Sequence, residues 1–220
     1  MEWQPYKALY LHVPFCKQRC KYCDFVTQAI ACDSPELDAY IERLIQSIRT
    51  YSNNEMLGSL ETVYIGGGTP SYLGNKLLSS LLYALSISMH LTPEVECTLE
   101  ANPDSLTESM VKDLYALGVN RLSIGVQSFD DALLKTLGRI HSAEQAKHAI
   151  EIAQQRFDNI SIDLMCGLPG QTLTQFQNDL EQACTLGVTH ISDRYKRVPF
   201  DGRRRNPLCF YGGCRNFSSR

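Results

Sequence analysis

The sequence predicts an α/β fold, in which parallel strands form one sheet beneath outer helices. Six short runs of β-branched and aliphatic residues alternate with longer stretches whose apolar residues recur at helical spacing. Polar residues and glycines gather at or just after the ends of these runs. Strand–helix–strand units with right-handed crossovers give a parallel sheet, which is either open or curled into a barrel. The alternation by itself leaves both architectures open.

The predicted strands are rich in β-branched and aliphatic residues, as strands buried beneath helices should be. They are residues 9–13, 62–65, 95–100, 121–127, 160–165 and 188–192.

The predicted helices begin at recognisable capping sequences. Asp33-Ser34-Pro35-Glu36 combines a cap, a helix-starting proline and an acidic first turn. The apolar stripe behind it consists of Leu37, Tyr40, Ile41, Leu44, Ile45 and Ile48. A serine or threonine followed three residues later by glutamate or glutamine predicts further helix starts, at Ser105 with Glu108, Ser142 with Gln145 and Thr172 with Gln175. Gly118 and Gly187 supply the stop signals of two of these helices.

Polar side chains lie at the carboxyl ends of several predicted strands. The run Gly66-Gly67-Gly68-Thr69 follows the second strand, and Glu100, Gln127 and Asp163 lie at the ends of later ones. Parallel strands bring these ends to one face, where βα barrels place their active sites. We therefore expect the functional site at this face.

The composition is that of an ordinary globular protein of 220 residues, with 44% hydrophobic and 20% charged residues. A net charge of −3 is too small to indicate a nucleic-acid or anionic-membrane partner. No apolar run approaches the roughly 20 residues that cross a bilayer. The first residues lack the basic and apolar regions of a signal peptide, so we expect a cytoplasmic location.

Three of the nine cysteines cluster in the pattern C-x3-C-x2-C, as Cys16, Cys20 and Cys23. Three thiolates in so short a loop can hold a [4Fe–4S] cluster, and a fourth would complete a conventional electron-transfer centre. With three, one iron keeps an open site for a substrate or cofactor. The basic residues between the cysteines would favour thiolates and offset the negative charge of the cluster, namely Lys17, Arg19 and Lys21.

A zinc site is the alternative interpretation of these cysteines, with His12 as the nearest fourth ligand. The other cysteines of the body are scattered, which indicates ordinary neutral thiols at Cys32, Cys97, Cys166 and Cys184. Cys209 and Cys214 form a second candidate metal pair, but two thiols without further ligands are weak evidence.

With the aromatic Tyr22 before its last cysteine, the motif resembles the signature of the radical S-adenosylmethionine (SAM) superfamily. The resemblance implies a complete or partial βα barrel, here a partial (βα)6-type TIM barrel. It also implies that SAM chelates the open iron and is cleaved to a 5′-deoxyadenosyl radical that abstracts a hydrogen atom. Gly66-Gly67-Gly68-Thr69-Pro70 is similar to the segment of the superfamily that binds the SAM amine.

The resemblance extends over about residues 8–192 and is greatest to the oxygen-independent coproporphyrinogen III oxidase family. True oxidases carry a further cysteine two residues after the third ligand, where this chain has Phe25. Phe25 therefore favours the HemW-like branch, which implies a haem chaperone. Oxidative decarboxylation of coproporphyrinogen III is the enzymatic alternative, and an inactive fragment is the third. The resemblance also implies haem or a porphyrinogen as ligand, a reductant such as a flavodoxin-type donor, and a haem acceptor of unknown identity.

Family roles carried over by motif give a set of SAM-contacting positions: Tyr10, Tyr22, Gly67, Gly68, Thr69, Glu100, Gln127, Arg139 and Asp163. The carboxylates can accept hydrogen bonds from an amine or a ribose, and the arginine can pair with a carboxylate. The alternative for the charged members is a salt-bridged barrel rim. His12 and His141 are candidate haem ligands or proton donors, although a lone histidine is more often structural.

The resemblance stops after Ser192, where the charge also reverses. Residues 193–220 contain eight basic and two acidic residues, a net charge of +6 in a chain whose total is −3. We expect residues 1–192 to form the barrel and residues 193–220 to be an unrelated basic tail, produced by a frameshift or truncation. A nucleic-acid-binding tail is the competing interpretation, but it lacks aromatic interleaving or a known binding module.

Overall fold

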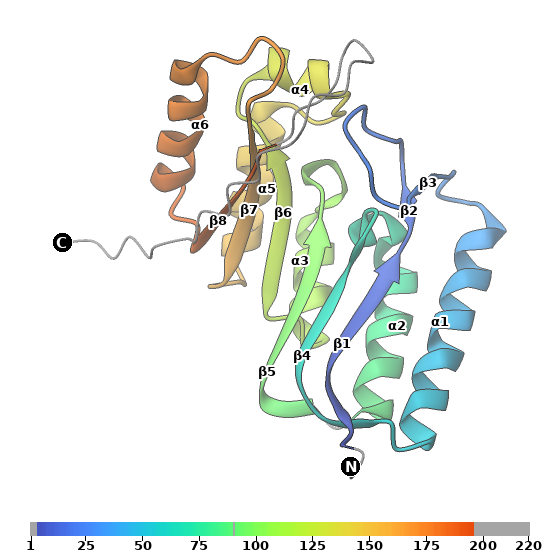
Figure 1. Cartoon of the computed structure of the whole chain (residues 1–220). Helices are drawn as coiled ribbons and strands as arrows, with labels where there is room; N and C mark the ends of the chain where they lie inside the picture. Colours follow the sequence, from blue (N-terminus) through green and yellow to red (C-terminus); the bar gives the residue numbers. More distant parts are fainter. Residues whose placement is uncertain (1–3, 90, 196–220) are drawn as a thin grey trace.

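Six parallel strands form the main sheet of the computed structural model, which describes residues 4–89 and 91–195. Each strand pairs with the one that precedes it in this sheet, in the order β1-β4-β5-β6-β7-β8 (Figure 1). Their bounds are β1 Tyr6–Val13, β4 Leu57–Gly67, β5 Leu91–Ala101, β6 Arg121–Gln127, β7 Ile160–Cys166 and β8 His190–Tyr195. This order has no reversal of direction, so the chain winds as in a βα barrel and not as in a doubly wound sheet. The described sheet has β1 and β8 as its two edges, which makes it a partial barrel and confirms the predicted fold class.

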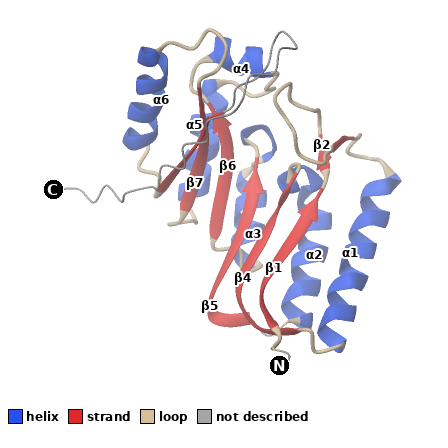
Figure 2. Ribbon diagram, in the orientation of Figure 1, coloured by secondary structure: helices blue, strands red, loops and turns tan. Residues whose placement is uncertain are grey.

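Helices connect successive strands and cover one face of the sheet (Figure 2). They are α1 Pro35–Asn53, α2 Gly74–Ser88, α3 Glu108–Ala116, α4 Asp131–Leu137, α5 Ala143–Gln154 and α6 Leu173–Thr185. Two short 3₁₀ helices, η1 Pro70–Leu73 and η2 Pro103–Ser105, follow β4 and β5.

The helix starts follow local hydrogen bonding at every predicted cap but one. Ser142 and Thr172 form complete capping boxes, each with the glutamine three residues later. Ser34 caps α1, whose predicted stripe packs into the core. The prediction of Ser105 as a cap is wrong, because Thr107 accepts from the Met110 amide and caps α3. Ser105 lies in η2, where its hydroxyl bonds the Ser71 hydroxyl from the turn after β4.

The two faces of the sheet differ in chemistry because side chains alternate along each strand. The face beneath the helices carries the core, which includes Val13, Ile65, Leu99, Ile124 and Ile162, all at most 1% exposed. The opposite, inner face carries polar and aromatic side chains, among them Tyr10, His12, Tyr64, Glu100 and Asp163. The helices thus stabilise the sheet from outside and leave its inner face to the site.

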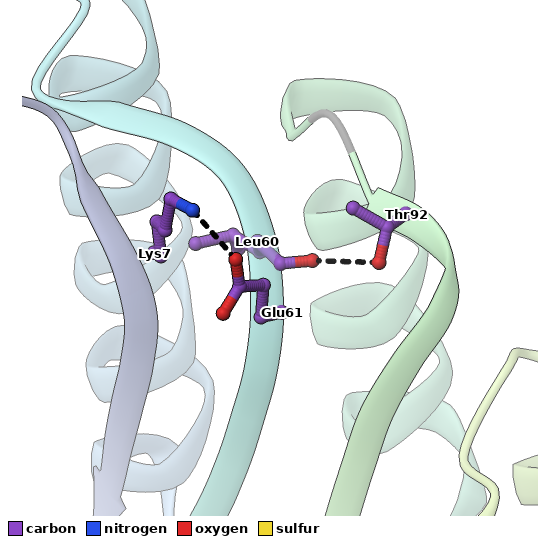
Figure 3. A network of polar contacts seen from close by, with 4 residues as sticks. All are labelled: Lys7, Leu60, Glu61 and Thr92. Atoms are coloured by element: carbon purple, nitrogen blue, oxygen red, sulfur yellow. Dashed lines mark hydrogen bonds and ion pairs between the residues drawn. The ribbon is translucent and has the colours of Figure 1, made fainter.

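Polar contacts join β1, β4 and β5 in the amino-terminal halves of these strands (Figure 3). Lys7 on β1 pairs with Glu61 on β4, with 2.7 Å between Nζ and Oε1. The β4–β5 register shifts between Leu60 and Thr62, and the Thr92 hydroxyl donates to the Leu60 carbonyl there at 3.2 Å. The Thr92 hydroxyl thus joins β5 to the backbone of β4 where the ladder is irregular.

The last strand runs three residues beyond Ser192. Asp193, Arg194 and Tyr195 continue β8 and pair with residues 164–166 of β7. The rest of the predicted tail, residues 196–220 with Cys209 and Cys214, lies outside the described residues.

Candidate functional site

The loop that carries the three cysteines follows β1 at the carboxyl end of the sheet (Figure 1). Its base is closed by two short strands, β2 Phe15–Cys16 and β3 Gln28–Ala29, which pair in parallel. Its far side is tied to the end of α4, where the Lys21 amide donates to the Leu137 carbonyl at 3.1 Å and the Gln18 amide group donates to the Gly138 carbonyl at 2.6 Å. The loop is therefore held at both ends over the inner face.

A cavity that is partly open to solvent lies between this loop and the strand ends. Eleven of the predicted site residues line it together: Cys16, Cys20, Cys23, Tyr22, Gly67, Gly68, Thr69, Glu100, Gln127, Arg139 and Asp163. The remaining one, Tyr10, is not among the lining residues; it is 56% exposed on the inner face, where its hydroxyl contacts His12.

The glycine-rich turn after β4 packs directly against the start of the cysteine loop. The Gly68 amide donates to the Val13 carbonyl at 2.7 Å, and the Thr69 amide donates to the Phe15 carbonyl at 2.8 Å. A Cβ atom on Gly68 would lie 2.6 Å from the Phe15 carbonyl oxygen, so glycine is needed for this approach. The Thr69 hydroxyl donates to the Cys16 sulfur at 3.5 Å. The turn and the first cysteine are thus one unit.

Glu100 at the end of β5 is fixed by both of its carboxylate oxygens. Tyr64 donates its hydroxyl to Oε1 at 2.7 Å, and the Gly67 amide donates to Oε2 at 2.9 Å. Burial, followed by the neighbouring carboxylate, raises the pKa of Tyr64, so this hydroxyl keeps its proton. Glu100 therefore holds the glycine-rich turn in place and presents its carboxylate to the cavity.

Arg139 follows α4 and reaches across the cavity to the cysteine loop. Its Nη2 donates to Asn102 Oδ1 and to the Gly125 carbonyl, both at 2.8 Å. Its Nη1 lies 3.6 Å from the Cys20 sulfur and 3.4 Å from the Tyr22 hydroxyl. The predicted loop cations, Lys17, Arg19 and Lys21, are exposed, and the guanidinium that contacts a cysteine sulfur belongs to Arg139 instead.

Gln127 and Asp163 line the cavity from neighbouring strands. Gln127 ends β6 with a φ of +71°, where the β6–β7 register shifts. A non-glycine residue in this region costs about 1–3 kcal/mol, and such strain collects at functional sites. Burial raises the pKa of Asp163, an effect that the Arg194 charge partly opposes. A Cβ atom on the cavity-lining Gly125 would lie 3.0 Å from Gln127 Nε2 and 3.1 Å from Asn102 Oδ1, so glycine leaves space there.

Among the described residues, the charged members of the site form no ion pair with one another. Within residues 4–89 and 91–195, the ion pairs are Lys7–Glu61, Lys76–Asp38 and His148–Glu151, all at the surface. Glu100, Arg139 and Asp163 take part in none of them, so the described structure does not support the rim alternative.

The two candidate histidines lie outside the cavity lining and are held by hydrogen bonds. His12 lies between the Tyr10 hydroxyl at 2.9 Å and the Val26 carbonyl at 3.1 Å. His141 is buried, and its Nε2 bonds the Val126 carbonyl at 3.0 Å. Burial, helped by the Arg139 charge, lowers the pKa of His141 to about 4, so the ring is neutral at physiological pH.

The donor set of the cysteine loop fits an iron–sulfur cluster. Cys16, Cys20 and Cys23 all line the cavity, and the thiolates of an iron–sulfur cluster each bind a different iron, so three of them leave one iron open. Burial raises the pKa of the Cys16 thiol, while the Thr69 hydroxyl favours its thiolate. Bound iron would overcome such a rise, because coordination deprotonates the thiol outright.

Two residues that line the cavity, and a third that supports the chain beside it, were not found from the sequence. Asn102 joins the Thr69 hydroxyl, at 3.0 Å, to Arg139. Arg194 on β8 lines the cavity with its guanidinium 5.7 Å from the centre of the Phe25 ring. Asp179 on α6 accepts hydrogen bonds from the Ser128 hydroxyl at 2.8 Å and from the Phe129 amide at 2.7 Å. These two residues directly follow Gln127 in the chain. Asn102 could have been predicted, because it is a polar residue two positions after Glu100 at the end of a predicted strand. No local sequence pattern predicts the role of Asp179.

Comparison with known proteins gives one family. The model of the Radical SAM superfamily matches residues 10–183. The heme chaperone HemW of Lactococcus lactis is 40% identical over 186 residues, which are 84% of this chain and 48% of that protein. HemW of Escherichia coli is 39% identical over 189 residues, 86% of this chain and 50% of that protein. The chain thus spans about half the length of the curated relatives it matches.

Solved structures agree on the fold. Coproporphyrinogen III oxidase (HemN) from Escherichia coli superposes with a TM-score of 0.78 at 28% identity, over 87% of this chain and 44% of that one. The methyltransferase TsrM from Kitasatospora setae, solved with cobalamin and a [4Fe–4S] cluster, has a TM-score of 0.60 at 13% identity, over 84% of this chain and 34% of that one. At that identity it is similar in fold alone. Among the described residues, the helices are too short or too polar to cross a membrane.

Proposed function

Because this chain belongs to the radical SAM superfamily, we propose that Cys16, Cys20 and Cys23 bind a [4Fe–4S] cluster with one open iron. The observation that carries the proposal is that the three cysteines, the glycine-rich turn and the polar strand ends line one and the same cavity. The superfamily uses such a cluster together with SAM, which supplies one-electron cleavage and hydrogen-atom abstraction when bound. The chain's own residues hold and orient both groups.

The residues that would hold SAM are the cavity-lining positions other than the cysteines. Backbone carbonyl oxygens of Gly67, Gly68 and Thr69 suit the SAM amine, because the amides of these three residues already donate to Glu100, Val13 and Phe15. Glu100, oriented by Tyr64 and Gly67, suits an ammonium or a ribose hydroxyl. The further contacts we propose are Tyr22, Gln127, Arg139 and Asp163, with Tyr10 on the open inner face beside them.

The function we propose is that of a HemW-like haem chaperone. It is supported by relatives named heme chaperone HemW at 36–40% identity and by Phe25 in place of the cysteine that oxidases carry. Phe25 is 50% exposed and lines the cavity, so this position is open to a ligand. Haem would pass to an acceptor protein, and a flavodoxin-type donor would reduce the cluster. We place the protein in the cytoplasm, where reducing conditions keep cysteines available for a cluster.

A second candidate function is oxidation of coproporphyrinogen III. The similarity in fold to HemN, at 28% identity, favours it. The two functions differ in outcome: a chaperone binds haem without turnover, whereas an oxidase forms protoporphyrinogen together with 5′-deoxyadenosine.

Anaerobic reconstitution with iron and sulfide tests the cluster. The wild-type chain is expected to take up about four irons and to gain the broad visible absorbance of a [4Fe–4S] centre. Cys20→Ser should abolish both signals. Cys184→Ser, at an exposed cysteine on α6, is the matched control and should retain them. Zinc uptake without iron, or equal loss in both variants, would contradict the proposal.

Haem titration of the reconstituted chain then tests the chaperone function. Saturable binding, seen as a shift of the haem absorbance, with no conversion of coproporphyrinogen III, is the expected result. Formation of protoporphyrinogen together with 5′-deoxyadenosine would favour the oxidase instead. Absence of both, with the cluster intact, would leave neither function for this chain.

A further inference from the structure

We propose that Arg139 raises the reduction potential of the cluster by donating a hydrogen bond to the Cys20 thiolate. The inference rests on the proposed cluster and adds an electronic role for a residue 119 positions away from the cysteine that it contacts. It does not depend on whether Arg139 also touches SAM.

The guanidinium is held so that its other terminal nitrogen, Nη1, faces the Cys20 sulfur and the Tyr22 hydroxyl, the latter at 3.4 Å. Nη2 is committed to two acceptors, Asn102 Oδ1 and the Gly125 carbonyl, each at 2.8 Å. Because a guanidinium is planar and rigid, these two bonds fix the direction of Nη1. Nη1 lies 3.6 Å from the Cys20 sulfur, a distance suited to an N–H···S bond. Asn102 is itself anchored by the Thr69 hydroxyl, so the arrangement is preorganised.

A donor and a positive charge at this position act on the reduced cluster. Reduction adds one negative charge, and hydrogen bonds to the sulfurs and the net local charge set the potential of such clusters. Arg139 and Cys20 are both half-buried, so their interaction is screened less than one between fully exposed groups. Arginine stays protonated throughout the physiological range, so the effect should not depend on pH. Arg139 thus makes the cluster easier to reduce.

The exposed loop cations offer the natural comparison. Arg19 donates to the Cys23 carbonyl at 3.3 Å and reaches no cysteine sulfur through an N–H···S bond in the described structure. Arg19 carries the same charge as Arg139 and lies within the cysteine loop itself, but it is exposed to solvent, which screens its charge. An effect specific to Arg139 therefore separates the hydrogen bond from simple proximity of charge.

A redox titration of the reconstituted chain, followed by electron paramagnetic resonance without SAM, tests the inference. Arg139→Met is expected to lower the potential, with about a tenfold change in the reduction equilibrium, equivalent to 59 mV for one electron. Arg139→Lys, which keeps the charge and loses the fork, should shift it less. Arg19→Met, the matched control, should shift it least.

A second variant covers the case in which Arg139→Met does not hold the cluster. Asn102→Ala leaves the charge in place and removes one anchor of Nη2, so a smaller shift in the same direction is expected. An unchanged potential in Arg139→Met or, if that variant loses the cluster, in Asn102→Ala would overturn the inference. So would an equal shift in Arg19→Met, or weakened SAM binding in Arg139→Met with the potential unchanged. Failure of the wild-type chain to take up iron would refute the proposed function instead, and is seen before any variant is compared.

Discussion

Replacing Gly68 by alanine should separate the glycine-rich turn from the cysteine loop. The new Cβ atom would lie 2.6 Å from the Phe15 carbonyl oxygen and 2.9 Å from both the Phe15 nitrogen and the Pro14 carbonyl carbon. All three are backbone atoms, which cannot rotate away as the end of a side chain can. The turn or the start of the loop must therefore move.

The cost follows from the contacts that this movement breaks. Overpacking of a fitted region costs about 1–3 kcal/mol. The Gly68–Val13 and Thr69–Phe15 backbone bonds would also be stretched, and each contributes about 0.5–1.5 kcal/mol. Together these effects destabilise the fold by about 2–6 kcal/mol. At about 2–4 °C per kcal/mol for a domain of this size, the Tm should fall by at least about 4 °C.

Thermal unfolding of the metal-free chain and iron content after reconstitution are the assays. Gly74→Ala is the matched control: its φ of +75° imposes backbone strain, but no atom lies within 4 Å of the added Cβ. With a ψ of 167° this position lies in a region open essentially to glycine, so the variant should cost about 1–3 kcal/mol and leave the iron content unchanged. Gly68→Ala should lower both Tm and iron content. A wild-type Tm and full iron content in Gly68→Ala, or an equal iron loss in the control, would refute the reasoning.

Three further predictions concern buried groups. Burial raises the pKa of Asp163, so the folded state binds the proton of this carboxyl more tightly than the unfolded state does. The ionised carboxylate therefore destabilises the fold once the pH exceeds 3.8, the ordinary pKa of aspartate. Asp163→Asn should raise the Tm at neutral pH but not in strong acid, and it should weaken SAM binding measured by calorimetry. Asp179→Ala should cost about 1–3 kcal/mol in denaturant unfolding, because the buried Phe129 amide loses its acceptor, and Asp179→Asn should restore most of this stability. Burial raises the pKa of Cys97 to about 11, so mass spectrometry after brief alkylation of the native protein should find Cys184 modified and Cys97 intact. A lower Tm in Asp163→Asn at neutral pH, equal losses in both Asp179 variants, or rapid modification of Cys97 would each contradict its prediction.

The fold could be predicted from the sequence because its signals are local. The capping boxes at Ser142 and Thr172 depend on a side chain and an amide three residues apart. The β6 strand likewise has the bounds that its apolar run predicts. Ser105 failed for the opposite reason: its hydroxyl bonds Ser71, 34 residues away, and that contact outweighed the local pattern.

The cysteine loop and the strand-end residues were also predictable, since parallel strands bring their carboxyl ends to one face. How these groups are held was not. The sequence by itself determined that three cysteines, a glycine-rich turn and several polar groups share one site. Only the tertiary structure decided that Glu100 braces the turn and that Arg139 faces Cys20. Such contacts join residues far apart in the chain, and their geometry depends on the packing of whole strands and helices, which no local pattern records.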